Sequence, residues 1–213
     1  MTTPQVVPPG HAPPAAFAKG STLRATLAWA RGAAGDEAAA RVVARLAPDD
    51  RAAVAAAAST DEVPFALVDR LSRAVDAELG AAHPDWAEAI GALAIESLGV
   101  QLYGNLLRRA SPLGFLTQEV SLFRLYYHPG DIRPVEIEET PEGGRVVLRL
   151  DGFGHAATES RWFCRRQTGG LARAASLAGG ERVRARHVRC ALEGDAFCEW
   201  ELRWTTRAPA AGG

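Results

Sequence analysis

The chain has 213 residues, of which 24 are basic and 25 acidic, so its formal net charge is −1. That balance argues against bulk electrostatic binding to nucleic acid or to an anionic membrane surface. Hydrophobic residues make up 47% and charged residues 23% of the chain, which excludes disorder throughout and allows a sizeable core.

Both ends of the chain are predicted to lie outside the fold. Residues 1–16 include a Pro-rich start and residues 207–213 are mostly small, so we expect two disordered tails. Residues 17–206 are expected to form a single α+β domain, which is helical over 17–128 and contains a sheet over 129–206.

The sequence shows no secretory or membrane segment. The first residues lack the basic start and the apolar stretch of a signal peptide. The longest apolar stretch, residues 89–107, is interrupted by Glu96, Gln101 and Asn105 and is too polar to span a bilayer. The sequence therefore predicts a cytoplasmic protein with neither nucleic acid nor membrane as a partner.

The first half of the chain has helical periodicity. Helices are expected over residues 23–31, ended by Gly32 and Gly35, then over residues 36–46, and again from about residue 49.

Two further helices are expected before residue 112. The first starts near Ser59–Glu62, which has capping-box spacing, with Asp61 as an alternative N-cap. Its buried face contains Val68, Leu71, Val75 and Leu79. The second starts near Pro84, ends at Ser111–Pro112, and buries Trp86, Ile90, Leu93, Leu98, Leu102 and Leu106. One more helical segment is expected to run to about Tyr127.

From Gly130 the apolar period changes to two. Val135 and Ile137 alternate with acidic residues, a turn follows at Pro141–Gly144, and apolar residues alternate again over residues 146–150. This pattern predicts a β-hairpin.

A helix and a second hairpin complete the predicted domain. The helix covers residues 158–177 and contains Gly169–Gly170, which we expect to permit close packing or to mark a kink. The second hairpin covers residues 182–204, with its turn at Glu193–Asp195. The expected fold is therefore α+β, with N-terminal helices packed on a late antiparallel sheet of two hairpins.

All three cysteines, Cys164, Cys190 and Cys198, fall in the last third of the chain. If the turn has three residues, Cys190 lies directly opposite Cys198, with Cβ atoms about 4.5–5.5 Å apart. Two thiolates at that separation can bind one tetrahedral zinc ion. Cys164 could approach from the helix, and His187 would complete a Cys₃His set.

Other arrangements of these residues are open. Residues three apart on a regular strand point to opposite faces, so His187 can join Cys190 only if a bulge intervenes. Without a bulge, His187 would pair with Glu201 on the outer face. The cysteines could also be three buried thiols, or Cys190 and Cys198 could form a cross-strand disulfide.

The segment over residues 158–204 resembles the 4-vinyl-reductase-type ligand-binding domain. That family includes sensor domains of phenol- and aromatic-responsive bacterial regulators, and it is related to TRAPP-component and heme-NO-binding-type domains. The resemblance rests on Glu159–Cys164 ahead of Gly169–Gly170, on the strand His187–Cys190, and on the run from Cys190 through Gly194–Asp195 to Leu202.

The resemblance implies a metal site. In zinc-bearing members the ligands are a Cys on the helix, a Glu, a Cys three residues on and a Cys eight residues further on. Cys164, Cys190 and Cys198 match these positions, and His187 stands at the Glu position. The implied cofactor is a structural Zn²⁺, because four protein ligands leave no open position for substrate.

The other histidines and the aromatic residues have simpler interpretations. His128 could be a heme ligand, but we interpret it and His155 as loop residues, and we expect no heme. The late aromatic residues could line an apolar pocket, but we favour a core or a dimer seam for Trp162, Phe163, Trp200 and Trp204.

The sequence contains no catalytic constellation and no phosphate-binding loop, so we do not expect an enzyme. The leading hypothesis is a sensor or regulatory module that binds a small apolar or aromatic molecule and signals to a protein partner. The alternative is a ligand-free, homodimeric interaction adaptor of TRAPP-like type. A homodimer is expected in either case, by analogy of fold.

Overall fold

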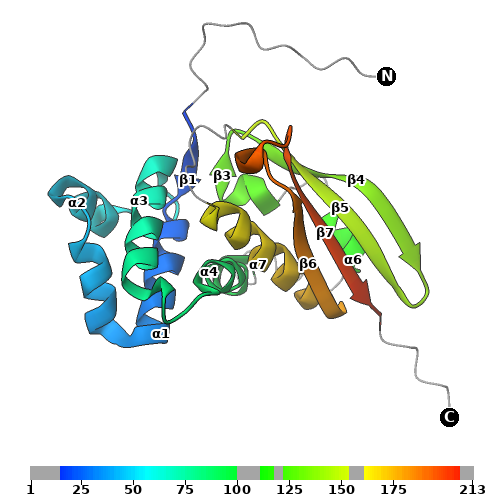
Figure 1. Cartoon of the computed structure of the whole chain (residues 1–213), viewed down its shortest axis with the longest axis horizontal. Helices are drawn as coiled ribbons and strands as arrows, with labels where there is room; N and C mark the ends of the chain where they lie inside the picture. The colour runs from blue at the N-terminus through cyan, green and yellow to red at the C-terminus, as the bar shows by residue number, and fades with distance from the viewer. Residues whose placement is uncertain (1–14, 100–110, 118–121, 154–160, 207–213) are drawn as a thin grey trace, which may run out of the picture.

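The computed structural model describes residues 15–99, 111–117, 122–153 and 161–206. Within these residues, helices gather on one side of the molecule and a four-stranded antiparallel sheet forms the other side (Figure 1). The predicted α+β class is therefore confirmed. None of the described helices combines the length and the apolarity that crossing a bilayer requires.

The first two predicted helices are one element, α1 (Ser21–Ala44). Gly35, predicted to end the first helix, instead forms a kink within α1, with φ 83° and ψ 172°. Glycine adopts a positive φ without the steric cost that a Cβ would bring, so the chain changes direction and resumes the helix. Helix α2 (Pro48–Ala56) then begins with proline in its first turn, where no backbone donor is lost.

Helix α3 (Phe65–Val75) continues into a π-helical turn, η1 (Asp76–Gly80). Its predicted buried face is confirmed for Val68, Leu71, Val75 and Leu79. The predicted N-cap is wrong, because Pro64 precedes the helix and the Asp61 carboxylate accepts a hydrogen bond from the backbone N of Ala58 at 2.7 Å.

A small sheet that the sequence did not indicate joins the start of the chain to its middle. Strand β1 (Phe17–Lys19) lies between β2 (Glu62–Pro64) and β3 (Tyr127–His128), and both pairings are antiparallel. Just before β1, the Ala16 carbonyl accepts a hydrogen bond from the backbone N of Phe65 at 2.9 Å.

The longest predicted helix is shorter in the part that the structure describes. Helix α4 (Trp86–Ala94) ends in a π-helical turn, η2 (Ile95–Gly99). Trp86 and Ile90 are buried as predicted and Leu93 is half-buried, whereas Leu102, Leu106 and the side chain of Leu98 lie outside the described residues. Two short helical turns follow at α6 (Pro112–Leu116) and η3 (Leu122–Leu125).

The main sheet contains both predicted hairpins. Its strands are β4 (Asp131–Thr140), β5 (Gly143–Asp151), β6 (Glu181–Arg189) and β7 (Cys198–Thr205), in the order β4-β5-β7-β6. Strands β4 and β6 are therefore the two edges. The exposed side chains of β6 include a series of arginines, Arg182, Arg184, Arg186 and Arg189.

Helix α7 (Trp162–Leu177) lies between α4 and the main sheet (Figure 1). It continues through Gly169–Gly170, and the predicted close packing is confirmed at Gly169. A Cβ there would lie 2.0 Å from the Glu88 carbonyl oxygen, and a Cβ on Gly91 would lie 2.0 Å from the Arg166 carbonyl oxygen. The backbones of α4 and α7 therefore touch, because glycine stands at both contacts.

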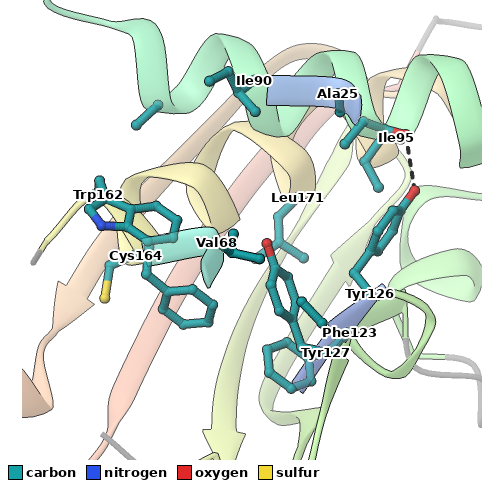
Figure 2. Packing of buried hydrophobic residues seen from close by; sticks show 14 of the residues in the cluster. Ala25, Val68, Ile90, Ile95, Phe123, Tyr126, Tyr127, Trp162, Cys164 and Leu171 are labelled. Atoms are coloured by element: carbon teal, nitrogen blue, oxygen red, sulfur yellow. Dashed lines mark hydrogen bonds between the residues drawn. The ribbon is translucent and has the colours of Figure 1, made fainter. Parts of the chain in front are cut away.

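Aromatic rings fill the interior between the small sheet and α7. Phe65 is fully buried at the centre and contacts Tyr127, Phe153, Trp162 and Phe163. Figure 2 shows part of this core, with Tyr126, Tyr127 and Phe123 grouped below α4 and α7. The predicted core positions of Trp162, Phe163, Trp200 and Trp204 are all buried.

Candidate metal centre

Helix α7 and the second hairpin bring the four predicted ligand residues together. Cys164 lies in the first turn of α7, His187 on β6, Cys190 just after β6, and Cys198 at the start of β7. Their ligand atoms all lie within 4.8 Å of one another, and the Sγ atoms of Cys164 and Cys198 are 3.8 Å apart. Two sulfurs on a tetrahedral zinc ion with Zn–S near 2.3 Å are about 3.8 Å apart.

The bulge that this arrangement requires is present on β6. His187 stands opposite Trp200, but Arg189 stands opposite Glu199, so the register shifts at the residue between them, Val188. The extra residue removes the strict alternation of faces and allows His187 to approach Cys190. His187 does not pair with Glu201. Arg189 instead forms an ion pair with Glu199 across the strands, with Nε and Oε2 3.2 Å apart.

The turn after β6 holds Cys190 in place, and it is longer than the predicted three residues. Residues Ala191–Glu193 form a 3₁₀ turn, and Gly194 follows with a positive φ of 99°. The Cys190 backbone N donates to the Asp195 carboxylate at 2.7 Å, and the Asp195 backbone N donates to the Cys190 carbonyl at 3.1 Å. This reciprocal pair fixes the backbone that carries the Cys190 thiol.

The three thiols are free and buried, so the alternative of a cross-strand disulfide is not realised. A hydrogen bond with the Cys198 sulfur, together with burial, raises the pKa of Cys164 far above its ordinary value. Burial also raises the pKa of Cys190. Without a cation the thiols of Cys164 and Cys190 therefore stay protonated at neutral pH, whereas a bound cation would stabilise the thiolates that ligate it.

The imidazole of His187 has an unsatisfied nitrogen beside these sulfurs. Its ring stacks on Trp200 with centroids 4.9 Å apart and an interplanar angle of 27°. Its Nε2 is buried and has no hydrogen-bond partner within the described part of the chain. A buried polar atom without a partner is costly, and a metal ion would satisfy it. The donor set and the geometry therefore fit a zinc ion.

Trp200 supports the cluster in a way that sequence reasoning missed. Its Nε1 donates to the Cys164 carbonyl at 3.2 Å and to the Thr168 hydroxyl at 3.1 Å. These bonds connect β7, the strand next to that of His187, to the helix that carries Cys164. The available signal was that Trp200 lies two residues after Cys198, on the same face of its strand.

Comparisons with known proteins identify structures of similar fold but no family for this chain. No protein-family model and no curated protein matches the sequence. Solved H-NOX structures do match. An H-NOX triple mutant from S. oneidensis in the Fe(II) state has a TM-score of 0.66 at 15% identity, over 92% of this chain and 100% of that chain.

Two more H-NOX structures show the same likeness. The Fe(II) unliganded protein from K. algicida has a TM-score of 0.62 at 11% identity, over 92% of this chain and 100% of that chain. A structure solved to probe heme distortion in the H-NOX family has a TM-score of 0.59 at 12% identity, over 92% and 98% of the two chains. At these identities the likeness shows the fold alone.

These neighbours confirm one sequence-based expectation and contradict another. The relation to heme-NO-binding-type domains is confirmed at the level of the fold, whereas the closer resemblance to 4-vinyl-reductase-type and TRAPP domains stays a prediction. The expectation of no heme is contradicted, because the proteins that share this fold contain Fe(II) and heme. It was therefore wrong to assume that domains of this fold do not bind heme.

A heme requires an axial ligand that faces a cavity. Among the described histidines, His83 packs edge-on against Trp29, and His128, which lies on β3 and not in a loop, stacks on Phe17. His187 belongs to the cysteine cluster, and His155 lies outside the described residues. Three cavities that border α1, α3, α4 and α7 are lined by no His or Cys, so the residues around them offer a heme neither of these axial ligands.

Proposed function

We propose that this chain is a sensor or regulatory module whose C-terminal part is held together by a Zn²⁺ ion. Its ligands are Cys164, His187, Cys190 and Cys198. One observation carries the metal site: four soft or borderline ligand atoms, three of them buried sulfurs, converge within 4.8 Å. Thiolate and imidazole ligands in a tetrahedral arrangement suit Zn²⁺, whereas Mg²⁺ and Ca²⁺ prefer oxygen.

The role of this metal is structural. Four protein ligands fill the tetrahedral shell and leave no position for substrate or water. The ion would join the first turn of α7 to both strands of the second hairpin, in addition to the hydrogen bonds that Trp200 on β7 donates to α7. We therefore propose a non-enzymatic role for the site.

The sensor assignment rests on the fold together with the resemblance to the 4-vinyl-reductase-type domain. One H-NOX protein with this fold was solved in its Fe(II)NO state, so the fold is compatible with the binding of small molecules. For this chain we propose a small apolar or aromatic ligand and a protein partner that receives the signal. A chain that responds to no such ligand would instead favour the homodimeric TRAPP-like adaptor.

The test is elemental analysis of the untagged protein and of three variants. Near-stoichiometric zinc is expected in the wild type, with its loss in Cys190→Ser and a reduced content in His187→Asn. His83→Asn is the matched control, because it changes a histidine outside the cluster and should retain zinc. A wild type without metal would contradict the site, and so would iron with a Soret absorption band in place of zinc.

A further inference from the structure

Arg166 carries a buried positive charge that no acidic residue compensates within the described part of the chain. Its side chain points from α7 toward α1, and the residue is 3% exposed. Its Nη1 donates to the Thr26 hydroxyl at 3.0 Å and its Nη2 to the Thr22 carbonyl at 3.2 Å. Both acceptors are neutral, and arginine stays protonated in proteins.

The neighbouring Arg165 shows the usual arrangement. It is half-exposed on α7, and its guanidinium pairs with the Glu88 carboxylate at 2.6 Å. Burying a charge without a counter-charge is much more costly than pairing it at the surface. An anion bound beside Arg166 would offset that cost.

The structure provides space for such an anion. A cavity of about 30 Å³ lies beside Arg166 and is lined also by Tyr127, Gln167, Ala94 and Ile95. This volume holds about two water-sized atoms, which is the size of the two oxygens of a carboxylate. The planar guanidinium matches a carboxylate in a two-point hydrogen-bonded pair.

A second polar group in this cavity is the hydroxyl of Tyr127. The Tyr127 hydroxyl is buried and lies near Arg166 and Gln167, but it makes no hydrogen bond of good geometry among the described residues. Burial raises the pKa of Tyr127, so its hydroxyl stays neutral and cannot serve as the counter-charge of Arg166. It is instead a hydrogen-bond donor available to an anion.

A larger cavity that shares lining residues with the first could hold the body of a ligand. Its volume is about 230 Å³, and Ala94 and Tyr126 line both cavities. Ser21, which also lines it, has a buried hydroxyl without a partner in the described residues. At these shared residues the Tyr126 hydroxyl donates a hydrogen bond to the Ala94 carbonyl, 3.0 Å long (Figure 2).

We propose that Arg166 anchors a site for a small organic carboxylate between α1, α4 and α7. The carboxylate binds the guanidinium and the Tyr127 hydroxyl, and a short apolar body extends past Tyr126. This inference deepens the proposed sensor function by naming the ligand class and rests on that function for its biological meaning, but it does not depend on the metal.

The test is thermal unfolding of the full chain in sodium acetate and sodium benzoate, against sodium chloride at equal ionic strength. Benzamide serves as the neutral counterpart of benzoate. At about 100 times Kd, a ligand specific for the native state raises the midpoint of a domain of this size by about 5–10 °C. We expect that rise with at least one carboxylate and not with benzamide.

Two arginine variants separate this site from surface effects. Arg166→Met should abolish the carboxylate-dependent rise, and without carboxylate it should be at least as stable as the wild type, because an uncompensated buried charge is gone. Arg165→Met is the matched control on the same helix and should retain the rise. Equal rises in Arg166→Met and the wild type would overturn the proposal, and so would no rise in the wild type.

A third variant keeps the test decisive if Arg166→Met does not fold. Tyr127→Phe removes only the hydroxyl, and it should raise the Kd of the carboxylate about tenfold, the effect of losing one hydrogen bond to a charged group. An unchanged Kd would overturn the proposed site. Stabilisation by benzamide but by no carboxylate would overturn this inference and leave the sensor function standing, and zinc content reports on the metal site separately.

Discussion

Helix α7 carries two buried polar centres, two residues apart, that face opposite parts of the molecule. Cys164 faces the main sheet, where three sulfurs and an imidazole converge. Arg166 faces the helices, where its partners are a hydroxyl and a carbonyl. The sheet side gathers ligand atoms that suit a cation, whereas the helix side holds a cationic guanidinium among neutral acceptors. The two sides of α7 therefore favour ligands of opposite charge.

Removal of the metal should have the largest effect on stability, and this effect should arise on the sheet side. A ligand at 1,000 times its Kd contributes about 4 kcal/mol, so a strong zinc chelator should lower the unfolding midpoint by about 10 °C. Cys198→Ala should already have this low midpoint and should not respond to the chelator. A wild type whose midpoint is insensitive to the chelator would contradict the proposed role of the ion.

On the helix side, the contact between α4 and α7 can be tested with two adjacent glycines. Gly169→Ala would place a Cβ against the Glu88 carbonyl and should cost about 1–3 kcal/mol. Gly170→Ala meets nothing closer than 3.5 Å and should be neutral or slightly stabilising, because alanine favours the helix. Urea unfolding compares the two variants, and equal stabilities would show that the helices can separate at little cost.

A smaller effect is expected where Thr168 joins α7 to Trp200. Thr168→Val removes one acceptor of the Trp200 Nε1, whose second bond to the Cys164 carbonyl is kept, so the loss should be about 0.5–1.5 kcal/mol. Thr168→Ser retains the hydroxyl and should lose less. If both variants match the wild type in urea unfolding, the side-chain bond contributes nothing to this contact.

The smallest effect should come from an ion-pair network of Arg145, Arg203 and Glu201 on the main sheet. Hydrogen bonds from Arg203 and Arg145 lower the pKa of Glu201 to about 2 from an ordinary value of 4.5. Because the pKa is lower in the folded state, the stabilisation is complete above pH 4.5 and is lost as the pH falls toward 2.

Arg145→Gln should raise the pKa of Glu201, so that acid unfolding begins at a higher pH, with a loss of less than about 1 kcal/mol at neutral pH. Arg133→Gln is the control, because Arg133 pairs with Asp151 at the far end of the same strand pair. Circular dichroism during acid titration measures both variants. An acid transition of Arg145→Gln that matches the wild type would exclude a stabilising role for the network.

The sequence anticipates the cysteine cluster better than the arginine site. The spacing of Cys190 and Cys198 across a hairpin, together with the family resemblance of residues 158–204, indicated which residues would meet. The sequence analysis named a bulge only as a condition, because a β-branched valine favours a strand and does not mark where the register shifts. Arg166 follows Trp162 by four residues, which places it on the buried face of α7, but the general preference of arginine for the surface conceals this signal.

How well each part of the fold could be predicted depends on the length of its sequence pattern. Both hairpins of the main sheet follow from alternation over several residues, which a strand of two or three residues cannot display. The small sheet of β1, β2 and β3 was therefore missed. Gly35 is a correct sign of a change in direction, but the sequence does not distinguish a helix end from a kink after which the helix resumes.

The edge strand β6 has a consequence for how this protein behaves at high concentration. A strand at the edge of a sheet presents unpaired backbone groups to which another chain can add, and such addition begins aggregation. Here an incoming copy would bring its own arginines against Arg182, Arg184, Arg186 and Arg189, and the bulge would interrupt a regular ladder. The same bulge that brings His187 to the cysteines therefore also helps to keep separate molecules from joining edge to edge.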